Sequence, residues 1–538
     1  MSIDRWQPQQ VHTRQEEALL RRLRKGRKLF AFLRDYRHEL FDDAFQCELD
    51  SMYRDTGAGR EPTPPSLLAM ALLLQSYDGV SDFEAVERTV IDLRWQMVLD
   101  RLGKHDAAFA QDTLRKFRER LIGANMDRRL LERTVELARR TNAFDWRKLP
   151  KDLRLAIDSS PLEGAARVED TINLLGHAAR KIVVCAAGLI DWSFEKVATA
   201  AGIPVLLESS VKKGLDVEWS DPEGKAQALD TLTRQIEALD AWLREKLPEE
   251  IKKPPLKKHI ETLAQIRTQD LEPDPSGGGK THIREGVAAE RRVSIEDPDM
   301  RHGRKSKSKL FNGYKRHIAL DLDTKLILAA AVLPANRPEA EASPALKEDI
   351  DQVKRRIAEI HIDRGYIVSR IVDEVLADGG EVLCKPWVPR NGKLFTKTDF
   401  KINMRDMTIT CPAGEVERID LGAEVVFDAE ACDHCPLRAK CTSAASGTGR
   451  TVSIASNERL QHRLRKLVST RRGRERLRER IPVEHSLAHV GRRQGRRARY
   501  CGTRRNLFDL RRTAAVQNLE TIDRRLTMAE SVTQRRAA

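Results

Sequence analysis

The chain has few aromatic residues and no long apolar run. Aromatic residues make up 5% of its 538 positions, against 33% for charged residues. No stretch approaches the roughly 18 consecutive apolar residues of a membrane-spanning helix, and the N-terminal segment MSIDRWQPQQVHTRQ contains no apolar signal core. Eight cysteines are too few, in so long a chain, for the disulfide framework of a small secreted protein. We therefore expect a soluble, cytoplasmic protein that has no membrane partner.

Basic residues are in excess, and the excess is local. The net charge is +15, and the segment from Arg471 to Arg512 holds fifteen arginines and no lysine against four acidic residues. Such a run can be the solvated face of a helix. The planar guanidinium suits phosphate, however, and arginine alone supplies the charge here, which favours a surface that contacts a nucleic-acid backbone. Double-stranded DNA is the expected partner.

The first 150 residues have a helical pattern. SLLAMALLLQSY is typical of a helix buried on all sides, and DTLRKFRERLI is typical of an amphipathic one. Helices of this kind serve either DNA binding or dimerisation, and the sequence alone leaves both roles open.

A second helical segment occupies residues 191–289. A leucine and isoleucine seam with steps of three and four predicts a helix that packs on a partner, and a second seam predicts its mate in a helical hairpin: Leu229, Leu232, Ile236, Leu239 and Leu243, then Leu256, Ile260, Leu263 and Ile266. The linker EPDPSGGGKTH follows. It is not a nucleotide-binding P-loop, because Asp274 stands where the first glycine is required and no apolar strand precedes it.

Beyond Lys309 the pattern changes to short apolar strands. LFNGYKRHIALDL and LILAAAVLP predict two antiparallel strands joined by a tight turn, and EIHID and EVLCKPW predict two more. SPALKEDIDQVKRRIA and SRIVDEVLADGG predict helices between them. This order indicates a mixed α/β sheet flanked by helices.

Two predicted strands each lead to an aspartate. LRLAIDSSP stops at Asp158, and AEIHIDRGY stops at Asp363. Carboxylates that converge from separate elements can bind a pair of Mg²⁺ or Mn²⁺ ions for phosphodiester chemistry. Glu484, a lone acid at the head of a predicted helix within the arginine-rich segment, is the best third ligand. Alternatively, each aspartate is a turn or helix cap, and Glu484 pairs with Arg480 one helical turn earlier.

Two other pairs of acids compete for the first position: Asp321 and Asp323, and Asp297 and Asp299. The first pair lies in a predicted hairpin turn, where aspartate is expected for turn chemistry. The second lies in a basic loop, which we expect it to order through Arg301 and Arg304. Asp158 is favoured because the end of a strand is a preorganised position for a metal ligand.

Four cysteines cluster late in the chain. TCPAG and EACDHCPLRAKC supply Cys411, Cys432, Cys435 and Cys441. A C-x2-C pair with flanking cysteines predicts a structural zinc site that holds a segment with little core of its own. Reduced structural or redox cysteines are the alternative.

The segment RHGRKSKSKLFNGYKRH interleaves basic and aromatic residues. This pattern suits contact with a nucleic-acid backbone together with base stacking on Phe311 and Tyr314. A solvated hairpin is the alternative. The basic residues are Arg301, Arg304, Lys305, Lys307, Lys309, Lys315 and Arg316.

Taken together and in order, several motifs resemble those of a bacterial insertion-sequence transposase of the DDE superfamily. They are IDSSPLEGAARVEDT, DPDMRHGRKSKSKLFNGYKRHIALDLDT, IHIDRGY, the cysteine block and RIPVEHSLAHVGRR. TPPSLLAMALLL and DTLRKFRERL also resemble the helical leader domain of that family, so the resemblance spans nearly the whole chain. It implies an RNase H-like catalytic core in which Asp158, Asp363 and Glu484 bind two Mg²⁺ or Mn²⁺ ions.

The resemblance also implies residues that hold DNA. The glutamate motif of the family is Tyr-x2-Arg-x3-Glu-x6-Lys. Arg480 matches its arginine, whereas Leu477 replaces the tyrosine and Gly491 the lysine. Arginines follow Gly491 directly, and the expected DNA-binding set is Arg480, Arg492, Arg493, Arg304, Lys305 and Lys315.

The implied organisation is a leader domain, a divided catalytic core and two inserts. The core comprises residues 151–190, 290–390 and 456–538, with a helical insert and linker at 191–289 and a cysteine-rich insert at 391–455. The expected function is binding of the terminal inverted repeats of an insertion sequence, DNA cleavage and strand transfer, by a homodimer at least. The alternatives are a structure-specific nuclease of the same fold and a non-catalytic zinc-containing DNA-binding regulator.

Overall fold

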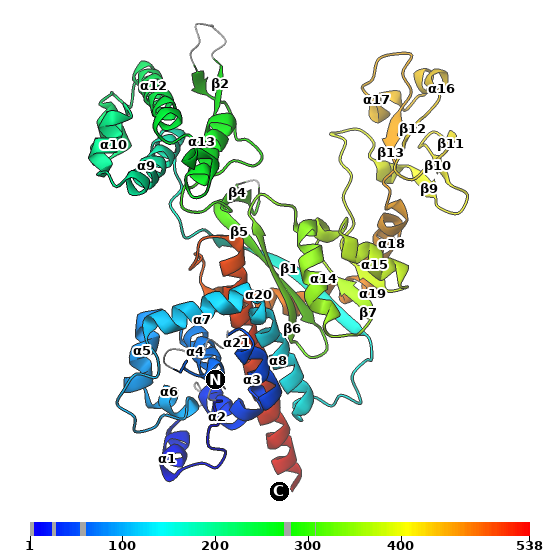
Figure 1. Cartoon of the computed structure of the whole chain (residues 1–538). Helices are drawn as coiled ribbons and strands as arrows, with labels where there is room; N and C mark the ends of the chain where they lie inside the picture. The colour runs from blue at the N-terminus through cyan, green and yellow to red at the C-terminus, as the bar shows by residue number, and fades with distance from the viewer. Residues whose placement is uncertain (1–4, 24–27, 54–60, 274–280, 307, 538) are drawn as a thin grey trace.

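The structure is a computed structural model that describes residues 5–23, 28–53, 61–273, 281–306 and 308–537. The linker segment 274–280, which includes Gly279 and Lys280, lies outside the described residues. A sheet stands at the centre, helices from both ends of the chain lie beside it, and two smaller units extend away from it (Figure 1).

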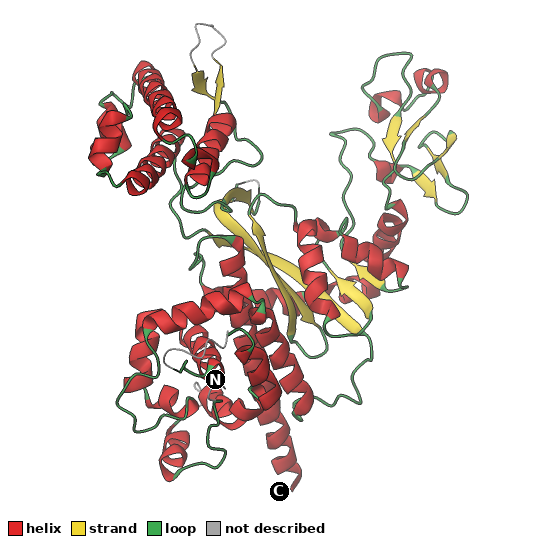
Figure 2. Cartoon of the chain, in the orientation of Figure 1, coloured by secondary structure: helices red, strands yellow, loops and turns green. Residues whose placement is uncertain are grey.

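The N-terminal region is helical, as predicted (Figure 2). Its central helix, α4, begins at Pro65 and ends at Asp78, and Gly79 caps it in a left-handed conformation with φ 73°. Residues 65–76 of α4 are buried on every face because the other helices surround it. The helices are α1 (Arg14–Arg22), α2 (Lys28–Leu40), α3 (Asp43–Asp50), α4 (Pro65–Asp78), α5 (Asp82–Ile91), α6 (Leu93–Val98), α7 (Gln111–Gly123) and α8 (Met126–Arg140).

The central sheet has six strands and is mixed, as predicted. Its order is β4-β5-β1-β7-β8, and β6 also pairs with β5. The pairs β1–β5, β4–β5 and β5–β6 are antiparallel, whereas β1–β7 and β7–β8 are parallel. The strands are β1 (Leu153–Glu163), β4 (Arg301–Arg304), β5 (Leu310–Asp321), β6 (Ile327–Pro334), β7 (Ile357–His361) and β8 (Glu381–Leu383).

Short helices connect these strands. The 3₁₀ helix η4 (Glu339–Ala342) and α14 (Ser343–Asp351) follow β6, whereas η5 (Arg364–Tyr366) and α15 (Arg370–Ala377) follow β7. Gly379, with φ 72°, follows Asp378, the residue that caps α15, at the position where the sequence predicted a glycine stop.

One hydrophobic core joins the N-terminal helices to the sheet and to the last two helices, α20 (Ile481–Gln494) and α21 (Thr503–Ala537). α21 contacts α4, α8 and β6. Its buried Asn518 exchanges two hydrogen bonds with the backbone of Ile327 in β6, at 2.7 and 2.9 Å, and donates a third to Thr134 in α8. The C-terminal helix therefore fixes the N-terminal helices against the sheet.

A second core lies in the helical segment between β1 and β4. The predicted seam of α12 is buried there, but α12 and α13 both pack against α9, which the sequence placed in the catalytic core. α9 is long and apolar enough to cross a membrane by length and composition, yet more than half of it is buried in this core. The elements are α9 (Thr171–Ile190), α10 (Phe194–Ala200), η2 (Pro204–Leu207), α11 (Val211–Leu215), α12 (Pro222–Lys246), η3 (Glu250–Lys252), α13 (Leu256–Asp270), β2 (Leu271–Pro273) and β3 (Thr281–Ile283).

A third, small core forms around Phe400, Ile409 and Phe427. It is built from short elements, and α18 (Glu458–Ser469) and α19 (Arg471–Arg478) lead from it to α20. The short elements are η6 (Lys397–Asp399), β9 (Lys401–Asn403), β10 (Thr408–Thr410), β11 (Val416–Arg418), β12 (Glu424–Val426), α16 (Ala429–Asp433), α17 (Arg438–Cys441) and β13 (Thr451–Ser453).

Candidate active site

Asp158 lies in the middle of β1, so the prediction that its strand ends there was wrong. β1 continues to Glu163 because β5 offers twelve residues to pair with, and Asp158 stands opposite Ile318. On the other edge, β7 pairs with β1 only as far as Ala156. Asp158 therefore follows the point where β1 loses its neighbour on one side, and this free edge opens the site.

Asp363 follows β7 by two residues. The preceding Ile360 and Ile362 are buried, whereas Asp363 itself is exposed. Its carboxylate accepts a hydrogen bond from the backbone N–H of Arg364 at 2.8 Å and begins η5. Because β1 and β7 are parallel neighbours, the residues that follow their paired segments lie at the same end of the two strands.

Glu484 lies in the first turn of α20, as predicted. Val483 and Leu487 are buried on this helix and anchor it, and α20 contacts both β1 and β5. Arg480 directly precedes the helix. Its guanidinium pairs with Asp158 at 2.6 Å and with Glu484 at 3.4 Å, so it joins the two acids.

The three predicted acids line one open cavity of about 560 Å³. Burial raises the pKa of Asp158, Arg480 opposes this effect, and the charges of Glu484 and Asp363 raise the pKa further. Carboxylates that repel one another in this way are stabilised by a divalent cation, and three of them suit a hard oxygen-seeking ion. The cavity is also lined by the predicted DNA-binding residues Arg304, Lys305, Lys315 and Arg480.

Arg316 explains one departure from the glutamate motif. It is 5% exposed and donates hydrogen bonds to Ser160 of β1, at 2.8 Å, and to Gln494 at the end of α20, at 3.0 Å. A Cβ at Gly491 would lie 2.9 Å from its guanidinium. Glycine at this position therefore lets α20 pass closely over a buried arginine, where the family has a lysine.

Arg492 and Arg493 are not among the residues that line the cavity. Arg493 donates to the backbone carbonyl of Tyr77 in α4 at 3.0 Å and pairs with Glu520 of α21 at 2.7 Å. Arg492 is exposed and lies beside His489. Arg493 thus ties α20 to the helices at the two ends of the chain.

The competing acids have other partners. Asp321 accepts hydrogen bonds from Thr324 at 2.6 Å and from the backbone of Asp323, as turn chemistry predicts. Asp297 is buried and accepts bonds from the Tyr314 hydroxyl and from the backbone N–H of Gly502. Asp299 accepts bonds from Thr503 at 2.8 Å. The expectation that this second pair orders the loop through Arg301 and Arg304 was wrong in its partners: Asp297 orders the loop by accepting the backbone N–H groups of Asp299 and Met300, and both acids hold the start of α21.

The expectation of base stacking was wrong for Tyr314 and stays a prediction for Phe311. The ring of Tyr314 is fully buried in the main hydrophobic core, whereas Phe311, 8% exposed, lines the cavity that holds the three acids. Arg304 and Lys305 at the tip of the β4–β5 hairpin are exposed. The hairpin therefore offers positive charge and the Phe311 ring to the cavity, whereas Tyr314 stabilises the fold.

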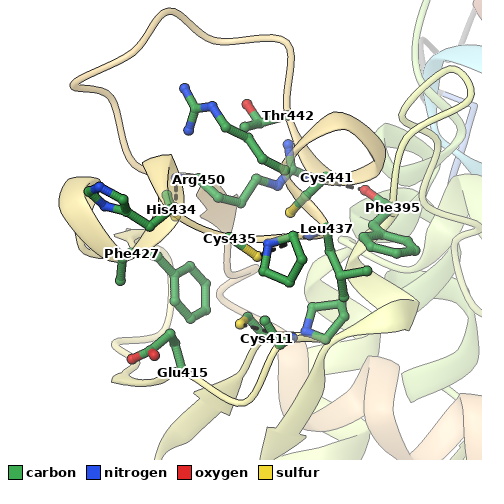
Figure 3. A pocket seen from close by; sticks show the side chains of 16 residues that line it. Phe395, Cys411, Glu415, Phe427, His434, Cys435, Leu437, Cys441, Thr442 and Arg450 are labelled. Carbon is green, nitrogen blue, oxygen red and sulfur yellow. Dashed lines mark hydrogen bonds between the residues drawn. The ribbon is translucent and has the colours of Figure 1, made fainter.

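The four clustered cysteines line one cavity of about 260 Å³ (Figure 3). None of the four forms a disulfide bond. Three of the sulfurs accept backbone N–H bonds: Cys411 from Ala413 at 3.3 Å, Cys435 from Leu437 at 3.4 Å and Cys432 from Arg450 at 3.5 Å. Burial raises the pKa of Cys441, and the other three cysteines raise it further.

A separate group of potential metal ligands was not predicted. Among the described residues, Glu359, His361 and Glu479 bring ligand atoms within 4.8 Å of one another. Arginines already occupy the carboxylates, however: Arg154 pairs with both glutamates, and Arg476 pairs with Glu359 at 3.2 Å. We interpret the group as an ion-pair network that attaches α19 to the edge of the sheet.

Two segments of the chain match known protein families. Residues 19–120 match the family described as Transposase domain (DUF772), and residues 409–522 match the family described as Transposase DDE domain. The second match contains Glu484 and the four cysteines, whereas Asp158 and Asp363 precede it. In comparisons with curated proteins and with solved structures, no match was found.

These two matches, at opposite ends of the chain, define the class: the protein is an enzyme that acts on DNA through a DDE domain. Within this class it is an insertion-sequence DDE transposase, which confirms the resemblance found in the sequence. A DDE domain implies dependence on a divalent metal ion.

Proposed function

We propose that the chain binds the terminal inverted repeats of its insertion sequence, cleaves the DNA there and joins the freed end to target DNA. The observation that carries this proposal is the single cavity lined by Asp158, Asp363 and Glu484 together with the basic residues at its rim. The strand order supports an RNase H-like core: β6, β5 and β1 are antiparallel, and the parallel strands β7 and β8 follow on the other side of β1.

The three carboxylates fit a pair of Mg²⁺ or Mn²⁺ ions. When bound, such ions activate the attacking oxygen and stabilise the leaving oxygen of an in-line displacement. Asp158, Asp363 and Glu484 would hold the ions, and Arg480 would be released from Asp158 to contact phosphate. Arg304, Lys305 and Lys315 would bind the DNA backbone beside them.

One site can perform both steps. Water is the nucleophile in cleavage, and the freed 3′-hydroxyl is the nucleophile in strand transfer, but each attacks a phosphorus atom held in the same place. The products of the first step therefore need only to be repositioned in the cavity. Because two ends of the element must be joined, the proposal includes a homodimer at least, acting on DNA in the bacterial cytoplasm.

The domain assignments form part of the proposal. Residues 1–150 would serve DNA binding or dimerisation, the helical insert would begin with α9 at Thr171 rather than at residue 191 and run to residue 289, and residues 391–455 would carry structural zinc on Cys411, Cys432, Cys435 and Cys441. The zinc assignment is supported by the shared cavity of the four thiols and by the N–H bonds to sulfur.

The test is a cleavage and joining assay with duplex DNA that carries the ends of the element. The unaltered protein should cut these ends and join them to target DNA with Mg²⁺ or Mn²⁺, whereas Asp363→Asn should bind DNA and do neither. Asp373→Asn, an exposed site on α15, is the matched control. Cut ends without joined product would indicate the nuclease, and an unaffected Asp363→Asn would indicate the non-catalytic regulator.

A further inference from the structure

Glu339 is a fourth carboxylate of the cavity that holds the three acids, and no motif pointed to it. It is the first residue of η4, the turn that follows β6. One of its oxygens accepts a hydrogen bond from the hydroxyl of Ser159 at 2.5 Å. Ser159 directly follows Asp158 in β1, so Glu339 contacts the segment that carries the first catalytic acid.

The other oxygen of Glu339 faces the segment that carries the second acid. Gly365 stands two residues after Asp363, and a Cβ placed on it would overlap the Oε2 atom of Glu339. The carboxylate therefore lies directly on the backbone of η5. Glycine is required at position 365 by this close approach, because any side chain would displace Glu339.

Tyr366, the next residue of η5, lies close enough to Glu339 and Asp158 to be affected by the charge of both. Its ring is fully buried, and its hydroxyl hydrogen-bonds to His317 of β5 at 2.6 Å. Burial raises the pKa of Tyr366, and the charges of Glu339 and Asp158 raise it further. β1, β5, η4 and η5 thus meet around Glu339.

We propose that Glu339 is a positioning residue: by accepting the Ser159 hydroxyl and resting on Gly365, it holds Asp158 and Asp363 at the separation that metal binding requires. This inference rests on the proposed function. It assigns Glu339 the support of the metal ligands, and it does not make Glu339 a ligand itself. Supporting contacts of this kind fix the orientation of ligands and change metal affinity when they are removed.

The first test compares Glu339→Ala with Glu339→Gln. The alanine variant loses the acceptor for Ser159, so its affinity for Mn²⁺ and its cleavage rate should each fall about tenfold to a hundredfold. The glutamine variant keeps an acceptor oxygen at the same reach and should stay close to the unaltered protein in both. Glu341→Ala, which alters an exposed residue of the same turn, should change neither.

Mn²⁺ affinity, measured by calorimetry without DNA, keeps this test separate from that of the proposed function. If the unaltered protein cuts no DNA, the proposed function fails, and the Mn²⁺ measurements still decide the role of Glu339. Unchanged Mn²⁺ affinity in Glu339→Ala would overturn the inference. Equal losses for alanine and glutamine would also overturn it, because they would make Glu339 a direct ligand.

A second test uses the two contacts of Glu339. Ser159→Ala should weaken Mn²⁺ binding as Glu339→Ala does, and the double variant should be no worse than the more damaged single one, because both remove one hydrogen bond. Gly365→Ala should be damaging in the unaltered chain and nearly neutral in the Glu339→Ala chain, where no carboxylate is displaced. Additive losses in either pair would contradict the inference. Circular dichroism of each variant confirms that it folds.

Discussion

At the scale of single side chains, the ion pair between Arg480 and Asp158 offsets the repulsion among the acids of the site. Asp158 is 15% exposed and close to two other acids, an arrangement that would be costly without a cation. The guanidinium of Arg480 supplies that cation at 2.6 Å and reaches Glu484 as well. The arginine therefore holds Asp158 and Glu484 close together.

His317, a buried histidine of β5, allows the effect of burial on the pH dependence of stability to be measured. It is fully buried, and burial first, then the charge of Lys315, lowers its pKa to about 3. Between pH 3 and 6.5 His317 is protonated in the unfolded chain and neutral in the folded chain. The contribution of His317 to stability is therefore complete above pH 6.5 and declines as the pH falls. Each unit of difference in pKa corresponds to about 1.4 kcal/mol.

We therefore expect the free energy of unfolding, measured with urea, to decline more steeply on acidification in the unaltered protein than in His317→Gln. Subtracting the two curves removes the other titrating groups. A difference that stays constant between pH 6.5 and 4 would show that His317 accepts its proton in the folded state.

At the scale of elements, α19 fixes where α20 begins. Arg476 of α19 pairs with Glu359 of β7 at 3.2 Å and with Glu381 of β8 at 2.7 Å, and Glu479 pairs with Arg154 of β1. Arg480 follows Glu479 directly. The network therefore attaches the segment that carries Arg480 and Glu484 to the strands that lead to Asp158 and Asp363.

Arg476→Ala should slow DNA cleavage more than it destabilises the fold. Half-exposed ion pairs contribute at most about 1 kcal/mol to stability, but a shift of about 1 Å at Glu484 can slow the reaction by on the order of a hundredfold. Arg471→Ala is the control, because Arg471 lies on the same helix, is 90% exposed and pairs with Glu475 of that helix. Equal cleavage rates for the two variants would show that the network does not position α20.

The elements that the sequence predicted are those whose signals are local. The β5–β6 hairpin followed from apolar runs around ALDLDT, β7 from alternating residues before Asp363, and the end of α15 from Gly379. The extension of β1 past Asp158 could not be predicted, because Ser159, Ser160 and Pro161 form a strand only through pairing with β5. Glu339 was missed for a similar reason, since its proposed role depends on the contact with Ser159, which lies in a distant segment of the chain.

For the whole molecule, separate hydrophobic cores indicate separate stabilities. The large core includes both ends of the chain and the sheet, whereas the region around the four cysteines has a small core of its own. A unit with so little buried apolar surface gains much of its stability from a bound metal. Zinc, if it binds there, should therefore stabilise one region and leave the rest unchanged.

Removal of zinc with a strong chelator, or the change Cys435→Ser, should expose residues 391–455 to limited proteolysis while the remaining chain stays resistant. Cys47→Ser, at an exposed cysteine of α3, should leave the digestion pattern unchanged. Metal analysis of the purified protein should find about one zinc per chain, as four thiolates require. Identical digestion with and without chelator would contradict the zinc assignment.

The central claim is that Asp158, Asp363 and Glu484, from three distant parts of the chain, form one metal centre. Calorimetric titration with Mn²⁺ tests it most directly, in the unaltered protein and in Asp158→Asn, Asp363→Asn and Glu484→Gln, with Asp373→Asn as the control. The account predicts that each of the three substitutions weakens binding by more than about tenfold and that the control binds as the unaltered protein does. Unchanged Mn²⁺ binding in any one of the three variants would contradict it.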